Sequence, residues 1–143
     1  MKLTAKGQYG IQAMFELALP GNEGPQSIKA IAERRGIPEA YLEQLIGALR
    51  KSGLVKSVRG AQGGYLLSAP PDSITVGQVL RALEGDLALF DCLADDACHK
   101  AGLCPTRTVW RKVHEGINRV VDDITLKDMV EDYERMLAGT EAL

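Results

Sequence analysis

A glycine-rich hairpin that directly follows a pair of short helices is the feature that most constrains the fold of this 143-residue chain. Residues 54–59 and 65–67 have the composition of two short β-strands, and the five residues between them include three glycines, which favour a tight turn. Before them, two helical patterns are separated at Gly36, as in a helix-turn-helix. A hairpin in this place is a wing, so the sequence predicts a winged helix-turn-helix.

Residues that start helices define the rest of the secondary structure. Thr4, Ser27, Thr75 and Thr125 each stand where apolar residues begin to recur at helical spacing, so they are predicted N-caps. Pro38 is expected at a first-turn position of a further helix, the recognition helix. The predicted fold class is therefore mainly α, or α+β once the two-stranded wing is counted.

The charge is distributed unevenly along the chain. Residues 1–68 hold nine Lys or Arg and five Asp or Glu, a net charge of +4, whereas residues 69–143 hold eight and fourteen, a net charge of −6. The asymmetry indicates that the first half meets a polyanion, although a chance partition of surface charge is the alternative.

The recognition helix offers side chains that match base edges. Gln44 is able to pair with adenine, and Glu43 is able to accept a hydrogen bond from the amino group of cytosine. Glu43 also repels phosphates, which makes it a candidate discriminator between sequences. The candidate DNA-binding residues are Tyr41, Glu43, Gln44, Arg50, Lys51 and Arg59. The alternative is that Glu43 is a solvated helix residue and that the winged helix binds a protein.

A long helix from Thr106 has more apolar surface than one small core needs. We expect it to form an isologous dimer, since helix-turn-helix proteins usually bind two half-sites, and the alternative is a helix packed on its own domain. Asp122 and Asp123 near its end are unfavourable to its dipole. The predicted dimerisation residues are Trp110, Val113, Ile117 and Val120.

The pair Pro70-Pro71 marks the expected domain boundary. It gives a DNA-binding domain over 1–69, a connecting helix and cysteine loop over 70–105, and a dimerisation helix with a C-terminal helix over 106–143. No apolar run approaches the roughly 20 residues that span a bilayer, and the N-terminus does not resemble a signal peptide. We therefore expect a cytoplasmic protein without membrane contact.

The three cysteines, Cys92, Cys98 and Cys104, are spaced by five residues within one predicted loop. An odd number excludes a fully disulfide-bonded scaffold, and the C-x2-C pattern of structural zinc sites is absent. The spacing leaves three alternatives open: a soft metal or iron–sulfur cluster, a redox switch, and unliganded thiols. His99 and His114 have ordinary interpretations as solvated residues, and no catalytic arrangement emerges, so the chain is not expected to be an enzyme.

Several segments together resemble a known family. They are MKLTAKGQY at the start, YLEQL at 41–45, SVRG at 57–60, GGYLL at 63–67, the three cysteines, and LCPT at 103–106. These segments are similar to the iron–sulfur cluster regulators of the IscR type, within the winged-helix bacterial repressor family. The resemblance extends over residues 1–135.

The resemblance implies a homodimeric repressor that binds a double-stranded DNA operator. It implies a 2Fe-2S cluster held by Cys92, Cys98 and Cys104, whose occupancy alters DNA preference so that cluster-assembly genes are repressed when clusters are abundant. It also places Glu43 and Gln44 at base edges and Arg59 of the wing in the minor groove.

One position departs from the family pattern. The usual fourth ligand, a His three residues after the last Cys, is replaced by Arg107, and a guanidinium has no lone pair to offer. His99 is a candidate replacement; a carboxylate (Asp91, Asp95 or Glu43), a group from the partner subunit and solvent are others. Gln8 departs from the carboxylate of nitric-oxide-sensing relatives.

The alternative functions are therefore a cluster-free repressor that responds to thiol oxidation or nitric oxide, and a cluster carrier or electron-transfer protein.

Overall fold

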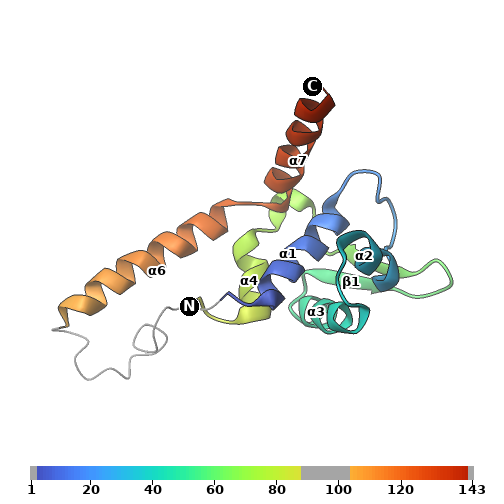
Figure 1. Ribbon diagram of the computed structural model, residues 1–143. Helices are drawn as coiled ribbons and strands as arrows, with labels where there is room; N and C mark the ends of the chain where they lie inside the picture. Colours follow the sequence, from blue (N-terminus) through green and yellow to red (C-terminus); the bar gives the residue numbers. More distant parts are fainter. Residues whose placement is uncertain (1–2, 88–103, 142–143) are drawn as a thin grey trace.

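The computed structural model describes residues 3–87 and 104–141, which form several helices and a small hairpin that extends from one edge of the body (Figure 1). Helices α1 (Ala5–Ala18), α2 (Ile28–Arg35) and α3 (Glu39–Lys51) precede strands β1 (Val55–Val58) and β2 (Gly64–Leu67). They are followed by the 3-10 turn η1 (Pro71–Ser73) and by helices α4 (Val76–Glu84), α6 (Pro105–Asp123) and α7 (Leu126–Glu141). The predicted mainly α fold with a two-stranded antiparallel wing is confirmed.

Local side-chain hydrogen bonds explain where four of the helices begin. The hydroxyls of Thr4, Ser27, Thr75 and Thr125 each accept a hydrogen bond from a backbone N–H two or three residues later, at 3.1–3.2 Å. At Thr75 the side chain of Gln78 returns a bond to the backbone and completes a capping box. Each cap satisfies a backbone donor that the helix itself leaves unpaired, which is worth about 1 kcal/mol.

Two helices begin one residue away from the predicted position, and both starts involve proline. Pro38 is the N-cap of α3 and lies outside the helix, whose first residue is Glu39. Helix α6 begins at Pro105 rather than Thr106, with Cys104 as its N-cap. Proline is favoured at the first helical position because the missing N–H would have no partner there.

Helix α1 lies at the centre of the hydrophobic core, in contact with α2, α3, α4 and α7. Met14, Ile31, Leu42 and Leu126 come from four different helices and are fully buried in one cluster. Each such side chain stabilises the fold by about 1.5–3 kcal/mol relative to an exposed position. The core therefore unites residues from both sides of the predicted boundary after residue 69, and the division into domains stays a prediction.

Helices α1 and α4 approach so closely that glycine is required between them. A Cβ atom at Gly10 would lie 2.0 Å from Cδ1 of Leu83. One turn earlier, Oε1 of Glu84 accepts hydrogen bonds from the backbone N–H groups of Gly7, at 2.9 Å, and Thr4, at 3.2 Å. Partial burial raises the pKa of Glu84, but the bonds from Thr4 and Gly7 outweigh it and hold that pKa below its ordinary value of 4.5.

The wing is fixed to the start of α2 by a third extended segment. Gln26 and Tyr65 exchange backbone hydrogen bonds of 3.0 and 2.8 Å beside the β1–β2 pair. The backbones are close enough that a Cβ atom at Gly64 would lie 2.5 Å from the carbonyl oxygen of Gln26. This contact sets the position of the wing relative to the helix-turn-helix.

Helices α6 and α7 project from this body in two directions (Figure 1). None of the residues of α6 is buried, whereas α7 buries Leu126 and Val130 near its start. Helix α6 touches the body through α4, which makes that contact decisive for where α6 points.

We expect Glu84→Gln to lower the free energy of unfolding at neutral pH by about 1 kcal/mol, because the charged acceptor for three donors of α1 is lost. The lowered native pKa means that the carboxylate stabilises the fold above pH 4.5 and that this contribution is lost as the pH falls through the native pKa. Urea unfolding should therefore show a difference between wild type and variant that shrinks as the pH decreases.

The matched control is Glu134→Gln, which neutralises an exposed acid on α7. A difference between wild type and Glu84→Gln that stays constant below pH 4.5 would contradict this assignment of the α1–α4 contact.

Candidate functional site

Helix α3 has one buried side and one exposed side. Leu42, Leu45, Ile46 and Leu49 are buried, which holds the helix against the core. Glu43 and Gln44, in the first half of the helix, are exposed to solvent. The first half of a recognition helix is the part that contacts base edges, so both side chains occupy positions suited to that role.

Tyr41 is placed differently from the other predicted DNA-binding residues. Its half-buried ring packs against the core and meets the ring of Tyr9 edge-on, with centroids 5.8 Å apart and planes at 81°. This geometry is favourable for an aromatic pair and fixes α3 to α1. A contact of Tyr41 with DNA stays a prediction.

Basic side chains follow one another from the end of α3 into the wing. Arg50 and Lys51 are exposed in the last turn of α3, and Lys56 and Arg59 are exposed on the wing. Helix α3 packs against β1, so the two groups belong to neighbouring elements. The exposed cations suit contact with a polyanion such as a phosphate backbone.

The helix-turn-helix is attached to α1 by a partly buried ion pair that the sequence analysis missed. Nε of Arg35 lies 3.3 Å from Oε1 of Glu16, whose side chain is only 4% exposed. Asn22 donates a second bond to that carboxylate at 3.3 Å, and the Arg35 guanidinium lies 5.0 Å from the ring centre of Phe15. A buried carboxylate needs such partners, and here they fix the end of α2.

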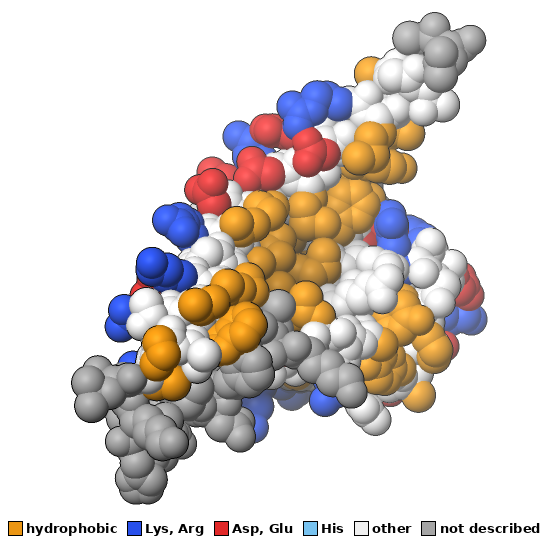
Figure 2. All heavy atoms as spheres, turned by 60° about the vertical axis from the view of Figure 1, so that its left-hand side comes forward, with side chains coloured by type: hydrophobic (Ala, Val, Ile, Leu, Met, Phe, Trp, Pro, Cys, Tyr) orange, Lys and Arg blue, Asp and Glu red, His pale blue; other side chains and the backbone are white. Residues whose placement is uncertain are grey.

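The apolar side of α6 is open to solvent in the chain. Val109 is 52% exposed, Val113 41% and Val120 58%, and Trp110 and the half-buried Ile117 lie on the same helix. Figure 2 shows hydrophobic side chains gathered in a band along the face formed by α6 and α7, with charged side chains beside it. An exposed apolar band of this kind is typical of a protein–protein contact.

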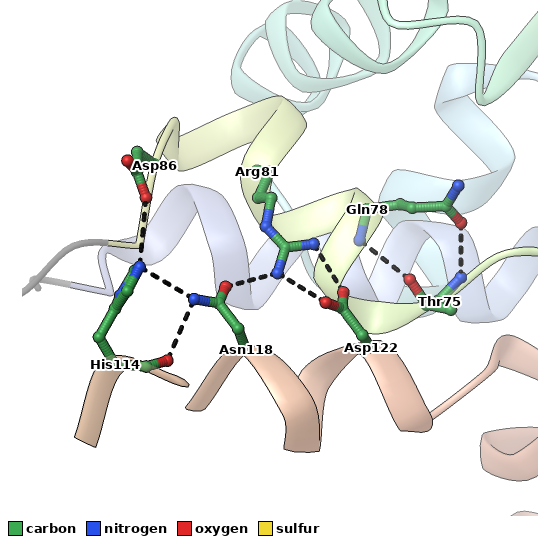
Figure 3. A network of polar contacts seen from close by, with 7 residues as sticks. All are labelled: Thr75, Gln78, Arg81, Asp86, His114, Asn118 and Asp122. Atoms are coloured by element: carbon green, nitrogen blue, oxygen red, sulfur yellow. Dashed lines mark hydrogen bonds and ion pairs between the residues drawn. The ribbon is translucent and has the colours of Figure 1, made fainter. Parts of the chain in front are cut away.

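A different side of α6 carries a polar chain that joins it to α4 (Figure 3). Arg81 of α4 holds both carboxylate oxygens of Asp122, at 2.6 and 3.0 Å, and Oδ1 of Asn118 at 2.5 Å. The hydrogen bond from Arg81 holds the pKa of Asp122 below its ordinary value, and the same bond raises the pKa of Arg81. Arg81 thus neutralises the carboxylate that is unfavourable to the α6 dipole.

His114 belongs to this polar chain, which corrects its interpretation as a solvated residue. Its side chain is only 19% exposed. Nδ1 lies 3.2 Å from the carbonyl oxygen of Leu87, and Nε2 lies 3.0 Å from Nδ2 of Asn118. The packing of α6 on α4 places His114 there, and its spacing of four residues from Asn118 and then from Asp122 was the signal in the sequence.

Of the three cysteines, the structure describes Cys104, while Cys92, Cys98 and His99 lie outside the described residues. Cys104 is the half-buried N-cap of α6, with its Sγ 3.1 Å from Oγ1 of Thr106. The positive end of a helix dipole favours a thiolate, the form in which cysteine binds metals. Within residues 3–87 and 104–141, no three His, Cys, Asp or Glu side chains are grouped to hold a metal ion.

The described part of the chain has no helix that is both long enough and apolar enough to span a membrane.

Comparison with known proteins identifies relatives over nearly the whole chain. The sequence model of the Rrf2 family, described as an iron-dependent transcriptional regulator, matches residues 3–132. The HTH-type transcriptional regulator CymR of Bacillus subtilis is 43% identical over 129 residues, which cover 90% of this chain and 89% of the relative. The HTH-type transcriptional regulator IscR of Erwinia tasmaniensis is 42% identical over 139 residues, covering 97% and 84%.

Solved structures lead to the same result. The structure of IscR from T. potens has a TM-score of 0.78 and 52% sequence identity, covering 95% of this chain and 90% of that one. The structure of CymR, described as the global cysteine regulator of B. subtilis, has a TM-score of 0.77 and 40% identity, covering 92% and 97%. These relatives are regulators and not enzymes, and their similarity includes the winged helix and α6. The chain therefore belongs to the Rrf2 family of DNA-binding transcriptional regulators.

Proposed function

We propose that the chain is a homodimeric repressor that responds to iron–sulfur cluster supply through a 2Fe-2S cluster held by Cys92, Cys98 and Cys104, and that it represses cluster-assembly genes. The observation that carries the proposal is the place of Cys104 as the N-cap of α6, the helix joined to the winged helix through α4. A ligand bound at Cys104 therefore acts on the element that orients the DNA-binding part.

Operator DNA is contacted by α3 and the wing. Glu43 and Gln44 lie at base edges in the major groove, where Gln44 pairs with adenine and Glu43 accepts a bond from cytosine. Arg59 enters the minor groove next to the glycine-rich turn, which leaves room for the backbone of DNA. The assignment is supported by the exposure of Glu43, Gln44 and Arg59 and by the packing of α3 against β1 of the wing.

The dimer forms through the apolar side of α6. Val113 and Val120, with Trp110 and Ile117, lie on a helix that buries none of its residues within the chain. Contact between two such helices removes these side chains from water and fixes the spacing of two winged helices, as binding to two half-sites requires.

The donors near α6 fit a cluster in part. Cys104 supplies a thiolate at a helix start, and a bound 2Fe-2S cluster supplies a one-electron redox centre. Arg107 lies in the first turn of α6, where a family histidine is expected, and cannot be a ligand. The proposal keeps His99, a carboxylate, a partner group and solvent as candidates for the fourth ligand.

A cluster-free thiol sensor is the second candidate, because the relatives of this chain include CymR proteins, one of them solved in a form described as oxidised. In that case metal-free protein would change its DNA affinity when its cysteines are oxidised. A cluster carrier or electron-transfer role is less consistent with the exposed faces of α3 and the wing.

Arg59→Ala is expected to weaken operator binding by about 1–3 kcal/mol and to reduce discrimination at minor-groove positions. The control Lys127→Ala removes an exposed cation from α7, far in the sequence from the wing. It should leave the operator affinity and the discrimination at minor-groove positions unchanged. Gel-shift titrations at fixed salt measure the two variants, and equal affinities of Arg59→Ala and wild type would refute the minor-groove role.

Val113→Glu is expected to convert the dimer to a monomer, because a carboxylate on the apolar side of α6 would have to be buried unpaired. Analytical ultracentrifugation should give twice the 15.5 kDa chain mass for wild type and for the control Thr108→Glu, which lies on another side of the same helix. A dimeric Val113→Glu protein would show that α6 does not form the interface.

Anaerobic reconstitution with iron and sulfide is expected to give a coloured protein with equal amounts of iron and labile sulfide. Cys104→Ser should lose most of the colour, whereas Thr106→Ser, which keeps a hydroxyl near the thiol, should retain it. Absorption spectra and iron analysis test this; a colourless wild-type protein without iron would contradict the proposed cofactor.

A further inference from the structure

The polar side of α6 forms a chain of hydrogen bonds with a fixed direction. His114, Asn118 and Asp122 are four residues apart and therefore lie on one side of the helix, toward Arg81 of α4 (Figure 3). A guanidinium only donates hydrogen bonds, so the Asn118 atom 2.5 Å from Arg81 must be its oxygen. The amide nitrogen of Asn118 then points to His114.

This direction determines which ring nitrogen of His114 carries the proton. The Asn118 nitrogen donates to Nε2 at 3.0 Å and to the His114 carbonyl oxygen at 3.1 Å, so Nε2 accepts. The carbonyl oxygen of Leu87, 3.2 Å from Nδ1, only accepts, so Nδ1 must carry hydrogen. Oδ1 of the exposed Asp86 lies 4.0 Å from the same Nε2, beyond hydrogen-bond distance, so Asn118 is its nearer partner (Figure 3). Arg81 thereby selects the Nδ1–H tautomer through Asn118.

The carbonyl that His114 holds belongs to Leu87. Leu87 is 2% exposed and is the last described residue before the segment that contains Cys92 and Cys98. Cys104 at the far end of that segment is the N-cap of α6. Both ends are thus attached to the same helix, one by the covalent chain and one by the His114–Leu87 hydrogen bond.

We propose that His114 is a positioning residue, which in its Nδ1–H tautomer holds the carbonyl of Leu87 to α6 and so sets the position of Leu87 relative to Cys104 at the start of the same helix. The role in cluster sensing rests on the proposed function, whereas the tautomer does not. Because Asn118 and Arg81 belong to the same chain of bonds, the position of Leu87 and the orientation of α6 on α4 depend on each other.

The first experiment measures the tautomer in metal-free protein. Imidazole ¹⁵N NMR at about pH 8, well above the ordinary His pKa of about 6.5, should show one histidine with protonated Nδ1 and unprotonated Nε2. The variant His114→Gln assigns this signal, since His99 is the other histidine. A wild-type His114 with its proton on Nε2 overturns the inference without any need for a variant to fold.

Asn118→Asp tests the origin of the tautomer. The carboxylate still accepts from Arg81 but has no hydrogen to donate, so His114 should place a proton on Nε2. The matched control is Glu115→Gln, which weakens the exposed Arg111–Glu115 pair, 3.9 Å apart on the same helix. An unchanged tautomer in Asn118→Asp would show that Asn118 does not select it.

The second experiment measures coupling to DNA. The ratio of operator affinities of reconstituted and metal-free protein should fall at least about fivefold in Asn118→Leu and stay unchanged in Glu115→Gln. An unchanged ratio in Asn118→Leu would overturn the coupling role. If wild type shows no difference between its two forms, the proposed function fails, and the NMR result alone decides the inference about His114.

Discussion

The contact between α4 and α6, centred on the ion pair of Arg81 with Asp122, is the constraint on which the arrangement of the molecule depends. Arg81 is 35% exposed and Asp122 is 47% exposed, so solvent screening leaves the pair little net energy. Its importance is geometric, because two carboxylate bonds and one amide bond leave the guanidinium a single orientation. Gly77 is part of the same contact, since a Cβ atom there would lie 2.1 Å from Oδ1 of Asp122.

Helix α4 connects this contact to the recognition helix, α3. Helix α4 packs against α6 on one side and against α1 and α3 on others. It therefore connects α6, with its exposed apolar side, to α3, which presents Glu43 and Gln44. The close α1–α4 packing at Gly10 and the partly buried Arg35–Glu16 pair allow little independent movement within that body. A change at α6 is therefore expected to alter how whole winged helices are presented, rather than the shape of one of them.

The parts of the fold that could be predicted are those set by neighbouring residues. Caps such as Thr4 and Thr125 act over two or three positions, and the hairpin follows from its glycine-rich turn. The Arg35–Glu16 and Arg81–Asp122 pairs could not be predicted, because their members are 19 and 41 residues apart and meet only once the core has formed. Sequence reasoning likewise identified the apolar side of α6 but not the polar side that contains His114.

The candidate site also has features that follow from local sequence and features that depend on the tertiary packing. Exposure of Glu43, Gln44 and Arg59 follows from the helix and turn patterns, whereas the packing of Tyr41 on Tyr9 depends on how α3 lies on α1. The three-cysteine site stays a prediction, of which the place of Cys104 at the start of α6 is the described part. The 2Fe-2S cluster was predicted from the family resemblance. Arg107 cannot be its fourth ligand, because a guanidinium has no lone pair to offer.

The most direct measurement of the central claim is selection of operators from a pool of random duplex DNA. Reconstituted protein and a variant with all three cysteines replaced by serine are compared under the same salt conditions. If the cysteine site controls the presentation of α3 and the wing, the two proteins select different consensus sequences. Identical consensus sequences with equal affinities would contradict the account and leave a repressor whose DNA binding is independent of its cysteines.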